Sequence, residues 1–327
     1  MSRKHFIELP VVSSGPAGTA TEDLPFPRDD KWNEQPKRPN WLRVRLQTGE
    51  SYGRIRKMTE GLRLNTVCQE ARCPNIFECW SEGTATFMIM GDTCTRACGF
   101  CNIKTGRPDA LDSEEPENVA EAVAQLKLSH AVITSVDRDD LPDLGSGHFA
   151  ATIKAVRARN PQTKVEVLIP DFQGKADCLQ RIFDARPDVL NHNTETVARL
   201  HRRVRTRAKY EWTLGVLKRA GQFRDEHFPE MFTKTGIMLG LGEGMAEVLE
   251  TIADIRDQGT DILTVGQYMR PTLKHLPVER YWTPEEFEHI RDEALKLGFK
   301  FVESGPLVRS SYHAGRHRRG AEKSGKI

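Results

Sequence analysis

Several features that would assign a class at once are missing from this chain of 327 residues. It has no run of about 18 apolar residues, so we expect no membrane-spanning helix. The opening residues, MSRKHFIELP, lack the apolar core of a secretory signal. The formal net charge of +2 gives no strong attraction to nucleic acid or to a membrane surface. We therefore expect a cytoplasmic protein with no nucleic-acid partner and no membrane partner.

Cysteine is scarce outside one region. Six of the seven cysteines lie between Cys68 and Cys101, and Cys178 stands alone. A disulfide framework would need an oxidising compartment, and a chain of this length can build its own hydrophobic core. Clustered thiols without an export signal favour metal binding or redox chemistry.

Composition divides the chain into four parts. Residues 1–50 are rich in Pro, Gly and charge, and we interpret them as an irregular N-terminal arm. Residues 51–84 form an extension that carries the first cysteines, and residues 85–300 form the main domain. Residues 301–327 form a C-terminal extension, whose basic, glycine-bearing tail after Ala314 we expect to be disordered.

From residue 86, short apolar runs alternate with longer amphipathic segments. The runs are rich in β-branched residues, as buried parallel strands are; they are TFMIM (86–90), AVITSV (131–136), KVEVLI (164–169), DVLNHN (188–193), TGIML (235–239) and DILTVG (261–266). The expected helices are 116–128, 148–160, 196–204, 211–223, 245–259 and 283–298, the last with Thr283 as its N-cap.

This alternation predicts an α/β fold with a parallel sheet. The sheet could be doubly wound or part of a (βα) barrel. In either architecture ligands bind at the carboxyl ends of the strands. The stretch CTRACGFC (94–101) follows the first strand and therefore falls where ligands bind.

The six clustered cysteines form two sets with different spacings. Cys94, Cys98 and Cys101 are spaced C-x3-C-x2-C, and Cys68, Cys73 and Cys79 are spaced C-x4-C-x5-C. Thiolates are soft donors that suit iron–sulfur clusters. Three thiolates hold three irons of a four-iron cluster and leave the fourth open. Because there are two sets of three cysteines with different spacings, the pattern indicates two separate clusters.

Two simpler interpretations remain at this point. Cys98 and Cys101 could be half of a zinc knuckle, but the usual second pair of ligands is absent. A pure electron carrier is the other interpretation, although ferredoxins are small and this chain attaches a whole α/β domain to its cysteines.

These residues resemble the radical S-adenosylmethionine superfamily, whose CxxxCxxC motif follows the first strand of a six-strand βα domain. The preceding C-x4-C-x5-C set narrows the resemblance to the lipoyl synthase family. Further stretches that resemble this family are SVDRDDLPD (135–143), VEVLIPDFQG (165–174), LNHNTETV (190–197) and GPLVRSSYHA (305–314). The resemblance covers about residues 54–314 and implies a partial (βα)6 TIM-type barrel with N-terminal and C-terminal cluster-bearing extensions.

The resemblance implies a radical-mediated sulfurtransferase. Cys94, Cys98 and Cys101 would hold the 4Fe–4S cluster that splits S-adenosylmethionine, and the resulting 5′-deoxyadenosyl radical would take hydrogen from C6 and C8 of a protein-bound octanoyl group. Cys68, Cys73, Cys79 and a serine of RSSY would hold an auxiliary 4Fe–4S cluster that supplies sulfur. The serine is Ser310 or Ser311, and we favour Ser311. Two molecules of S-adenosylmethionine would be used per lipoyl product, and no acid or base residue is expected.

The resemblance also suggests further contacts and partners. The residues expected near S-adenosylmethionine are Phe100, Asn191 and Asn193, and those expected near the substrate are Asp137, Arg138, Asp139, Asp140 and Arg309. The implied partners are octanoylated lipoyl domains of the glycine-cleavage H protein and of 2-oxoacid dehydrogenase acyltransferase subunits, a flavodoxin or ferredoxin reductant, and an iron–sulfur carrier. The alternatives are another radical enzyme, such as a biotin synthase-like or methylthio-transferring protein, and a non-enzymatic iron–sulfur electron carrier.

Three local features are less easily assigned. Leu144 stands where this family usually has glycine, and Gly244 stands where it usually has threonine. A basic run (199–209) includes Arg205; it is either a solvated helix face or a docking patch for an acidic carrier domain.

Overall fold

The computed structural model describes residues 32, 34–42, 61, 62, 64–67, 75, 86–312 and 314–324. Its centre is an eight-stranded sheet in the order β1-β2-β5-β6-β7-β8-β9-β10. Only β1 pairs antiparallel with its neighbour; the other neighbouring pairs in this sheet are parallel. The strands are β1 (Asn65–Thr66), β2 (Thr86–Ile89), β5 (His130–Ser135), β6 (Lys164–Leu168), β7 (Val189–Asn191), β8 (Phe232–Leu239), β9 (Ile262–Gln267) and β10 (Phe301–Gly305).

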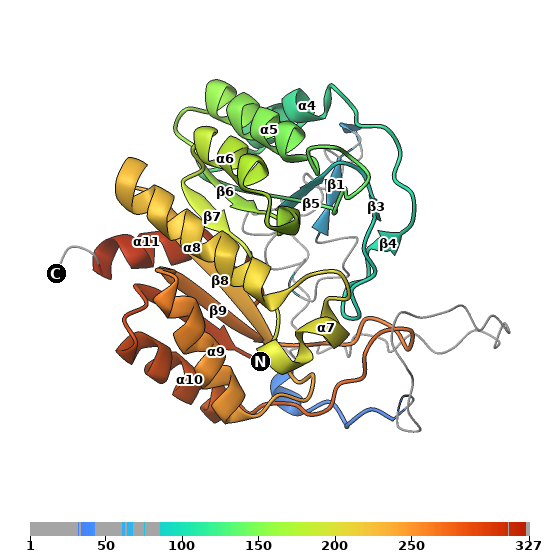
Figure 1. Ribbon diagram of the computed structural model, residues 1–327, viewed down its shortest axis with the longest axis vertical. Coiled ribbons are helices and arrows are strands. Elements are labelled where there is room, and N and C mark those ends of the chain that lie inside the picture. The colour runs from blue at the N-terminus through green and yellow to red at the C-terminus, as the bar shows by residue number, and fades with distance from the viewer. Residues whose placement is uncertain are drawn as a thin grey trace, which may run out of the picture.

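The six apolar runs of the sequence become six adjacent parallel strands, β2 and β5 to β9. Their residues are almost wholly buried because each strand is covered on both faces. The sheet curves, and helices lie along its outer side (Figure 1). The expected α/β fold with a partial barrel is therefore confirmed.

Helices connect the strands, as the amphipathic segments predicted. They are α4 (Glu115–Leu126), α5 (Ser146–Arg159), α6 (Ala176–Asp184), α7 (His201–Val204), α8 (Tyr210–His227), α9 (Met245–Asp257) and α10 (Pro284–Lys296). Val248, Ile252 and Ile255 of α9 are fully buried at helical spacing. The sequence interpretation missed α6, which lies between β6 and β7.

The start of α10 confirms its predicted cap. The Thr283 hydroxyl accepts a hydrogen bond from the Glu286 N–H at 3.3 Å, and the Glu286 carboxylate accepts one from the Thr283 N–H at 2.8 Å. This reciprocal pair satisfies two N–H groups that the first helical turn leaves unpaired.

The C-terminal tail after Ala314 was expected to be disordered, and this expectation is wrong for residues 315–324. Together with Ala314 they form helix α11 (Ala314–Ser324). Ala314, His317 and Ala321 share one face of the helix and are fully buried. The His317 ring lies 5.3 Å from the Phe301 ring of β10, measured between centroids. Tertiary packing of this face stabilises a helix whose basic composition alone would not.

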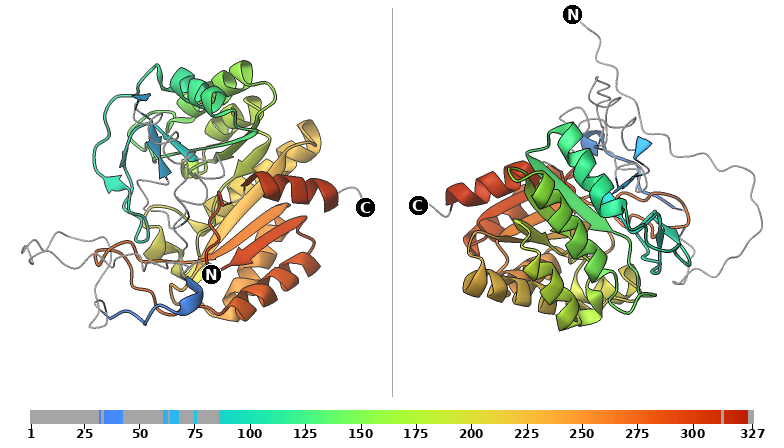
Figure 2. Two further views of the ribbon diagram at one scale, coloured as in Figure 1. Left: turned by 180° about the vertical axis from the view of Figure 1, so that it is seen from behind. Right: turned by 90° about the horizontal axis from the view of Figure 1, so that it is seen from above.

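The sequence analysis ended the main domain at residue 300, and the sheet in the structure extends beyond this boundary. Strand β10 pairs in parallel with β9 over its whole length, so the sheet continues past residue 300. Helix α11 then lies at the end of the barrel opposite to α7 and to the short strands β3 (Thr93–Cys94) and β4 (Lys104–Thr105) (Figures 1 and 2).

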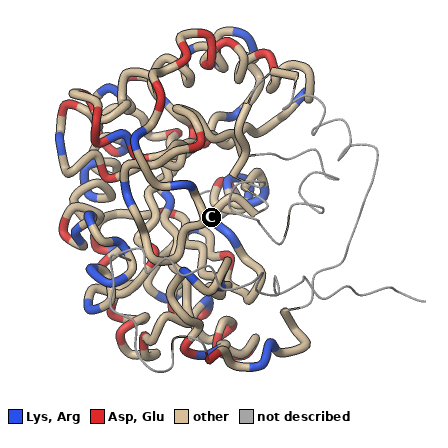
Figure 3. The backbone as a smooth tube through the Cα atoms, turned by 90° about the vertical axis from the view of Figure 1, so that its right-hand side faces the viewer, with Lys and Arg blue, Asp and Glu red and all other residues tan. Residues whose placement is uncertain are grey.

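Two global expectations concern membranes and charge. Within the described ranges, no helix combines the length and apolar character needed to cross a bilayer. Acidic and basic residues are interspersed along the backbone (Figure 3), in keeping with the near-neutral net charge.

Candidate active site

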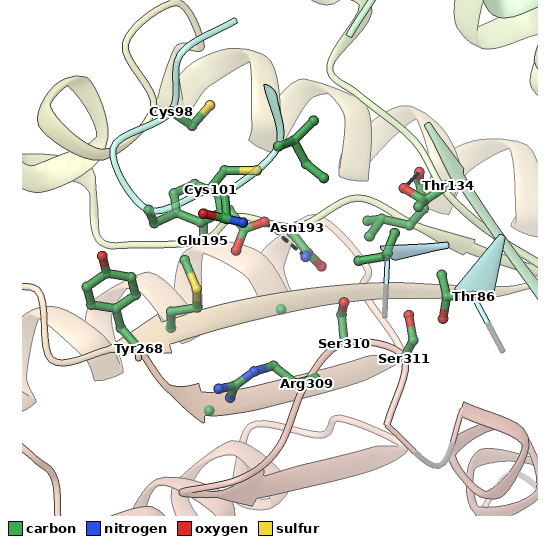
Figure 4. A pocket seen from close by; sticks show the side chains of 18 of the residues that line it. Thr86, Cys98, Cys101, Thr134, Asn193, Glu195, Tyr268, Arg309, Ser310 and Ser311 are labelled. Carbon is green, nitrogen blue, oxygen red and sulfur yellow. Dashed lines mark hydrogen bonds between the residues drawn. The ribbon is translucent and has the colours of Figure 1, made fainter. Parts of the chain in front are cut away.

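A cavity of about 580 Å³ lies at the carboxyl ends of the strands (Figure 4). Its wall is mainly apolar, and it takes residues from the ends of β2 and β5 to β9 and from the segment after β10. The apolar lining includes Met88, Val136, Ile169, Ile237, Met238 and Tyr268. Concave apolar sites with a few polar groups are typical of small-molecule binding.

Cys94, Cys98 and Cys101 all line this cavity, as the sequence predicted. Cys94 ends β3, and its Sγ atom accepts hydrogen bonds from two backbone N–H groups, those of Arg96 at 3.4 Å and Asp137 at 3.3 Å. Donors aimed at sulfur favour its thiolate form, which is the form that binds metals.

Burial acts in the opposite direction on these thiols. It raises the pKa of Cys94 to about 11, with a further contribution from the carboxylate of Asp137. Burial likewise raises the pKa of Cys101 to about 12, and it also raises the pKa of Cys98. The free thiols are therefore protonated near neutral pH, and metal binding must release their protons.

The chemistry of the three thiols fits an iron–sulfur cluster. Thiolates are soft donors, and each thiolate of a 4Fe–4S cluster binds a different iron. Cys94, Cys98 and Cys101 all line one cavity, so they offer the donor set that such a cluster takes.

The cysteine loop, residues 94–101, is held from one side by a buried arginine that the sequence interpretation missed. Arg96 is 4% exposed. Its guanidinium donates to both carboxylate oxygens of Asp139, each at 2.8 Å, and lies 2.9 Å from each oxygen of Asp171. A third carboxylate, that of Asp137, lies 3.3 Å away.

The other side of the cysteine loop is held through its backbone. The Gly99 N–H donates to the Val204 carbonyl, and the Gly99 carbonyl accepts from the Leu276 N–H, both at 2.9 Å. A ring nitrogen of His275 lies 2.9 Å from the Cys101 carbonyl oxygen. Helix α7 and the segment after β9 therefore enclose the loop.

Ser310 and Ser311 reach the same cavity from the segment after β10 (Figure 4). This segment folds back tightly over β9, where a Cβ atom at Gly266 would collide with the Val308 carbonyl oxygen. Arg309 also lines the cavity, and its guanidinium donates to the carbonyl oxygens of Val308 at 2.7 Å and Gln267 at 3.2 Å.

Cys68, Cys73 and Cys79 lie outside the described residues. Two described neighbours of theirs, Val67 and Asn75, line the cavity. The Asn75 amide also donates to the Leu307 carbonyl at 2.7 Å. The segment that carries the first cysteine set therefore contacts both the cavity and the serine segment at these two points.

The residues expected near S-adenosylmethionine are only partly together. Phe100 and Asn193 line the cavity, whereas Asn191 is fully buried in β7 and is not part of its lining. Glu195, which the sequence interpretation missed, does line the cavity and accepts a hydrogen bond from the Asn193 amide at 3.0 Å. Burial raises the pKa of Glu195. Its φ of 69° is unusual for a non-glycine residue, and it lies in the segment that follows β7.

The loop after β5 serves the scaffold more than the cavity. Of its four expected site residues, Asp137 lines the cavity. Arg138 is 3% exposed and forms two 2.9 Å hydrogen bonds with Asp140, and Asp139 pairs with Arg96. Burial raises the pKa of Asp137 to about 6, against the attraction of Arg96.

The basic run of residues 199–209 is not one solvated face. Arg205 is 9% exposed and points inward, where it donates to the Asn193 carbonyl at 2.9 Å and lines the cavity. Arg199 forms a salt bridge with Glu247 at 2.7 Å. The sequence of this run gave no signal that Arg205 points inward while Arg199 of the same run points outward.

Comparison with known proteins identifies relatives over almost the whole chain. The Radical SAM superfamily matches residues 88–255, and the N-terminal domain of lipoyl synthase matches residues 18–73. Lipoyl synthase of Symbiobacterium thermophilum is 57% identical over 85% of this chain and 86% of its own length. Lipoyl synthase of Rubrobacter xylanophilus is 53% identical over 95% of both chains. The mitochondrial lipoyl synthase of Nematostella vectensis is 52% identical over 91% of this chain and 99% of its own length.

Solved structures with a similar fold are much more distant in sequence. Streptococcus suis SuiB bound to S-adenosylmethionine has a TM-score of 0.52 at 9% identity, over 71% of this chain and 54% of that chain. Such a likeness concerns the fold alone. The sequence matches establish that this chain belongs to the lipoyl synthase family of the radical SAM superfamily and is a radical SAM sulfurtransferase.

Proposed function

We propose that the cavity at the carboxyl ends of the strands is where two sulfur atoms are inserted at C6 and C8 of a protein-bound octanoyl group. One observation carries this proposal: Cys94, Cys98, Cys101, Ser310 and Ser311 line one cavity although they come from distant parts of the sequence. Sulfur insertion requires the site that generates the radical and the site that gives sulfur to lie beside one substrate.

Membership of the radical SAM superfamily implies a 4Fe–4S cluster and S-adenosylmethionine. Such a cluster, when bound, supplies the electron that cleaves S-adenosylmethionine. Cys94, Cys98 and Cys101 would hold it, and Phe100, Asn193 and Glu195 would contact S-adenosylmethionine. The Asn193 amide and the Glu195 carboxylate offer both donors and acceptors to a polar ligand.

The chain's own residues supply position and shelter. A carbon radical abstracts hydrogen from an unactivated C–H bond only when the carbon is held close and water is excluded. Met88, Val136, Ile169 and Ile237 give the cavity an apolar wall that suits an aliphatic chain. This wall would orient the octanoyl group and exclude water from it.

The second cluster belongs to the proposal as well. Cys68, Cys73 and Cys79 would hold it together with Ser311. A serine oxygen is a harder donor than a thiolate, so we expect it to be the weakest of the four ligands to iron. Contacts of Val67 and Asn75 with the cavity support this location. We further propose that each product consumes two molecules of S-adenosylmethionine.

Membership of the lipoyl synthase family implies a lipoyl-domain substrate. We propose that the natural carriers are the glycine-cleavage H protein and the acyltransferase subunits of 2-oxoacid dehydrogenases. A flavodoxin or ferredoxin would be the reductant, and an iron–sulfur carrier would rebuild the auxiliary cluster. We place the reaction in the cytoplasm, where thiols stay reduced.

An anaerobic assay tests the proposal directly. Reconstituted protein is mixed with dithionite, S-adenosylmethionine and an octanoylated lipoyl-domain peptide. The mass of the peptide is then measured by mass spectrometry. We expect a gain of two sulfur atoms, formation of 5′-deoxyadenosine, and about eight irons per chain. Absence of both 5′-deoxyadenosine and sulfur gain would refute the assignment.

Single substitutions then separate the roles. Cys98→Ala should abolish 5′-deoxyadenosine formation, whereas Ser311→Ala and Ser311→Cys should retain it and lose sulfur transfer. Ser310→Ala tests the neighbouring hydroxyl in the same way. Cys178→Ala is the matched control, because Cys178 is buried in α6 outside the cavity lining. Full sulfur transfer by Ser311→Cys would exclude the proposed role of the serine oxygen.

A further inference from the structure

We propose that Arg96 is the positioning residue of the cysteine loop, which it fixes to the loops that follow β5 and β6. The inference rests on the proposed function, because it assumes that Cys94, Cys98 and Cys101 hold a cluster. It concerns a side chain that lies between two of these ligands in the sequence but is not itself a ligand.

The first argument is the hydrogen bonding of the guanidinium. All three nitrogens of Arg96 are used: Nε and Nη2 bind the two oxygens of Asp139, and Nη1 and Nη2 bind Asp171. Paired contacts of this kind fix the orientation of the guanidinium plane as well as its position. Because Asp139 follows β5 and Asp171 follows β6, one side chain joins three segments that are far apart in the sequence.

The second argument is burial. Arg96 is 4% exposed, and Asp171 is fully buried. The only other cation within 4 Å of Asp171 among the described residues is Arg205, at 3.9 Å. Loss of Arg96 would therefore leave this buried carboxylate with one backbone donor, the Gln173 N–H at 2.9 Å, and one distant cation, which is costly. The pKa of Asp171 is lowered because its attraction to Arg96 outweighs the effect of burial, so this carboxylate is charged.

The third argument is a set of hydrogen bonds beside Arg96 that joins the cysteine loop to the loop after β5. The Thr95 N–H and hydroxyl donate to the Asp137 carbonyl at 3.1 and 3.0 Å, and the Thr95 hydroxyl accepts from the Asp139 N–H at 3.0 Å. The Asp137 N–H in turn donates to Cys94 Sγ. The position of Cys94 is thus set by the loop after β5, which Arg96 holds in place.

Lysine cannot replace this function, because a single ammonium lacks the planar pair of donors that grips two carboxylates. Arg96→Lys keeps the charge and removes only the geometry. The matched control is Arg224→Lys. Arg224 is buried as well, at 9% exposed, and binds the buried Asp261 at 2.6 Å, but this pair lies at the amino-terminal ends of β8 and β9, away from the cysteines.

The first measurement uses the metal-free full-length chain. Hydrogen–deuterium exchange is followed by mass spectrometry in peptides covering residues 93–101 and 137–143, together with thermal unfolding. In Arg96→Lys we expect exchange in both peptides to rise about tenfold or more, the effect of losing charged hydrogen bonds. In Arg224→Lys the same peptides should stay within about twofold of the wild-type rate, even where its melting temperature falls equally.

The second measurement follows iron in a chain whose Cys68, Cys73 and Cys79 are replaced by Ala, so that only the second cysteine set can bind a cluster. We expect Arg96→Lys to lose iron to a chelator about tenfold faster than Arg224→Lys. We also expect the change that S-adenosylmethionine causes in the electron paramagnetic resonance spectrum to be diminished only in Arg96→Lys.

The outcomes distinguish the two proposals. If the parent chain in this background binds no iron, the cluster assignment of Cys94, Cys98 and Cys101 fails, while the exchange data still report on Arg96. If iron binds and Arg96→Lys matches Arg224→Lys in exchange and in iron loss, Arg96 is not a positioning residue. Should Arg96→Lys fail to fold, Asp139→Asn removes one arm of the contact and should give the same local pattern.

Discussion

Leu144 shows how one residue can carry opposing energies. Its φ is 54°, a left-handed conformation that costs a leucine about 1–2 kcal/mol, yet its side chain is only 4% exposed. The family's usual glycine would avoid that cost. The leucine found here offsets it by burying its side chain in the core around α5 and β5.

At most buried positions an alanine variant is more stable than a glycine variant. At residue 144 we expect the reverse order of stability. Leu144→Ala loses the packed side chain, at about 2–5 kcal/mol, and keeps the backbone strain. Leu144→Gly loses the same packing but removes the strain. We expect the glycine variant to be about 1 kcal/mol more stable than the alanine variant, by urea unfolding. At the buried helical Leu179 the alanine variant should be the more stable one. The same order at both positions would contradict this interpretation.

At the scale of elements, helix α11 depends on a glycine that fits against a ring. A Cβ atom at Gly320 would collide with the ring of Phe301, whereas one at Gly315 would have its nearest neighbour, Arg319, at 3.4 Å. Alanine usually stabilises a helix relative to glycine. In α11 we expect alanine to stabilise the helix only at residue 315.

Thermal unfolding of two alanine variants tests the packing of α11. Gly315→Ala should stabilise the protein or leave it unchanged, within about 1 kcal/mol. Gly320→Ala should destabilise it by about 1–3 kcal/mol, because the ring or the helix must move. If Gly320→Ala were as stable as Gly315→Ala, α11 would not pack against β10 as described.

Strands β5, β6 and β8 share a buried polar cluster of His130, Glu166 and Lys234. Lys234 Nζ lies 2.7 Å from one oxygen of Glu166, and His130 Nε2 lies 3.0 Å from the other. Burial alone would raise the pKa of Glu166, but the charge of Lys234 and the hydrogen bond from His130 outweigh it and lower the pKa to about 2 from its ordinary 4.5.

The lowered pKa predicts part of the acid sensitivity of the fold. The unfolded chain binds the proton first, so this contribution is complete above about pH 4.5 and is lost as the pH falls toward 2. We expect Glu166→Gln/Lys234→Met to fold and to lose stability less steeply between pH 4.5 and 3 than wild type, in urea titrations. Lys234→Met alone should cost about 3–5 kcal/mol at pH 7. An unchanged slope in the double variant would exclude this source of acid sensitivity.

At the scale of the whole molecule, Trp32 of the N-terminal arm is joined to the segment that follows β9. Trp32 is 3% exposed, and its indole N–H donates to the Leu273 carbonyl at 2.7 Å. The Arg270 guanidinium donates to the Trp32 carbonyl at 2.8 Å and to the His275 carbonyl at 2.8 Å. His275 contacts the cysteine loop, so Trp32 buttresses the segment that encloses it.

Removal of this indole should loosen the arm. Trp32→Ala should cost about 3–5 kcal/mol of local stability and should speed proteolysis within residues 34–42. Trp32→Phe keeps an aromatic ring but loses the hydrogen bond and part of the buried surface, so it should cost less than Trp32→Ala, about 1–2 kcal/mol. Trp41, which is 43% exposed, is the control, and Trp41→Ala should stay within about 0.5 kcal/mol of wild type. Equal effects of the two alanine substitutions would rule out the anchoring contact.

Much of the architecture was predictable because its signals are local. Six β-branched runs and their amphipathic partners predicted six parallel strands and most of the helices, and the Thr283 cap predicted the start of α10. The position of CTRACGFC (94–101) directly after the first apolar run predicted its place at the carboxyl end of the first strand. Each of these signals lies within about 20 residues, which is the range that periodicity and capping rules describe.

The tertiary structure alone decided which distant residues meet. Arg96 and Asp171 are far apart in sequence, as are Cys94 and Ser311, and no local pattern pairs them. Likewise, Arg205 faces inward within a basic run, and α11 folds from a tail of basic composition. Burial and charge pairing depend on what the rest of the chain places opposite a residue, so their outcome appears only when the chain is packed.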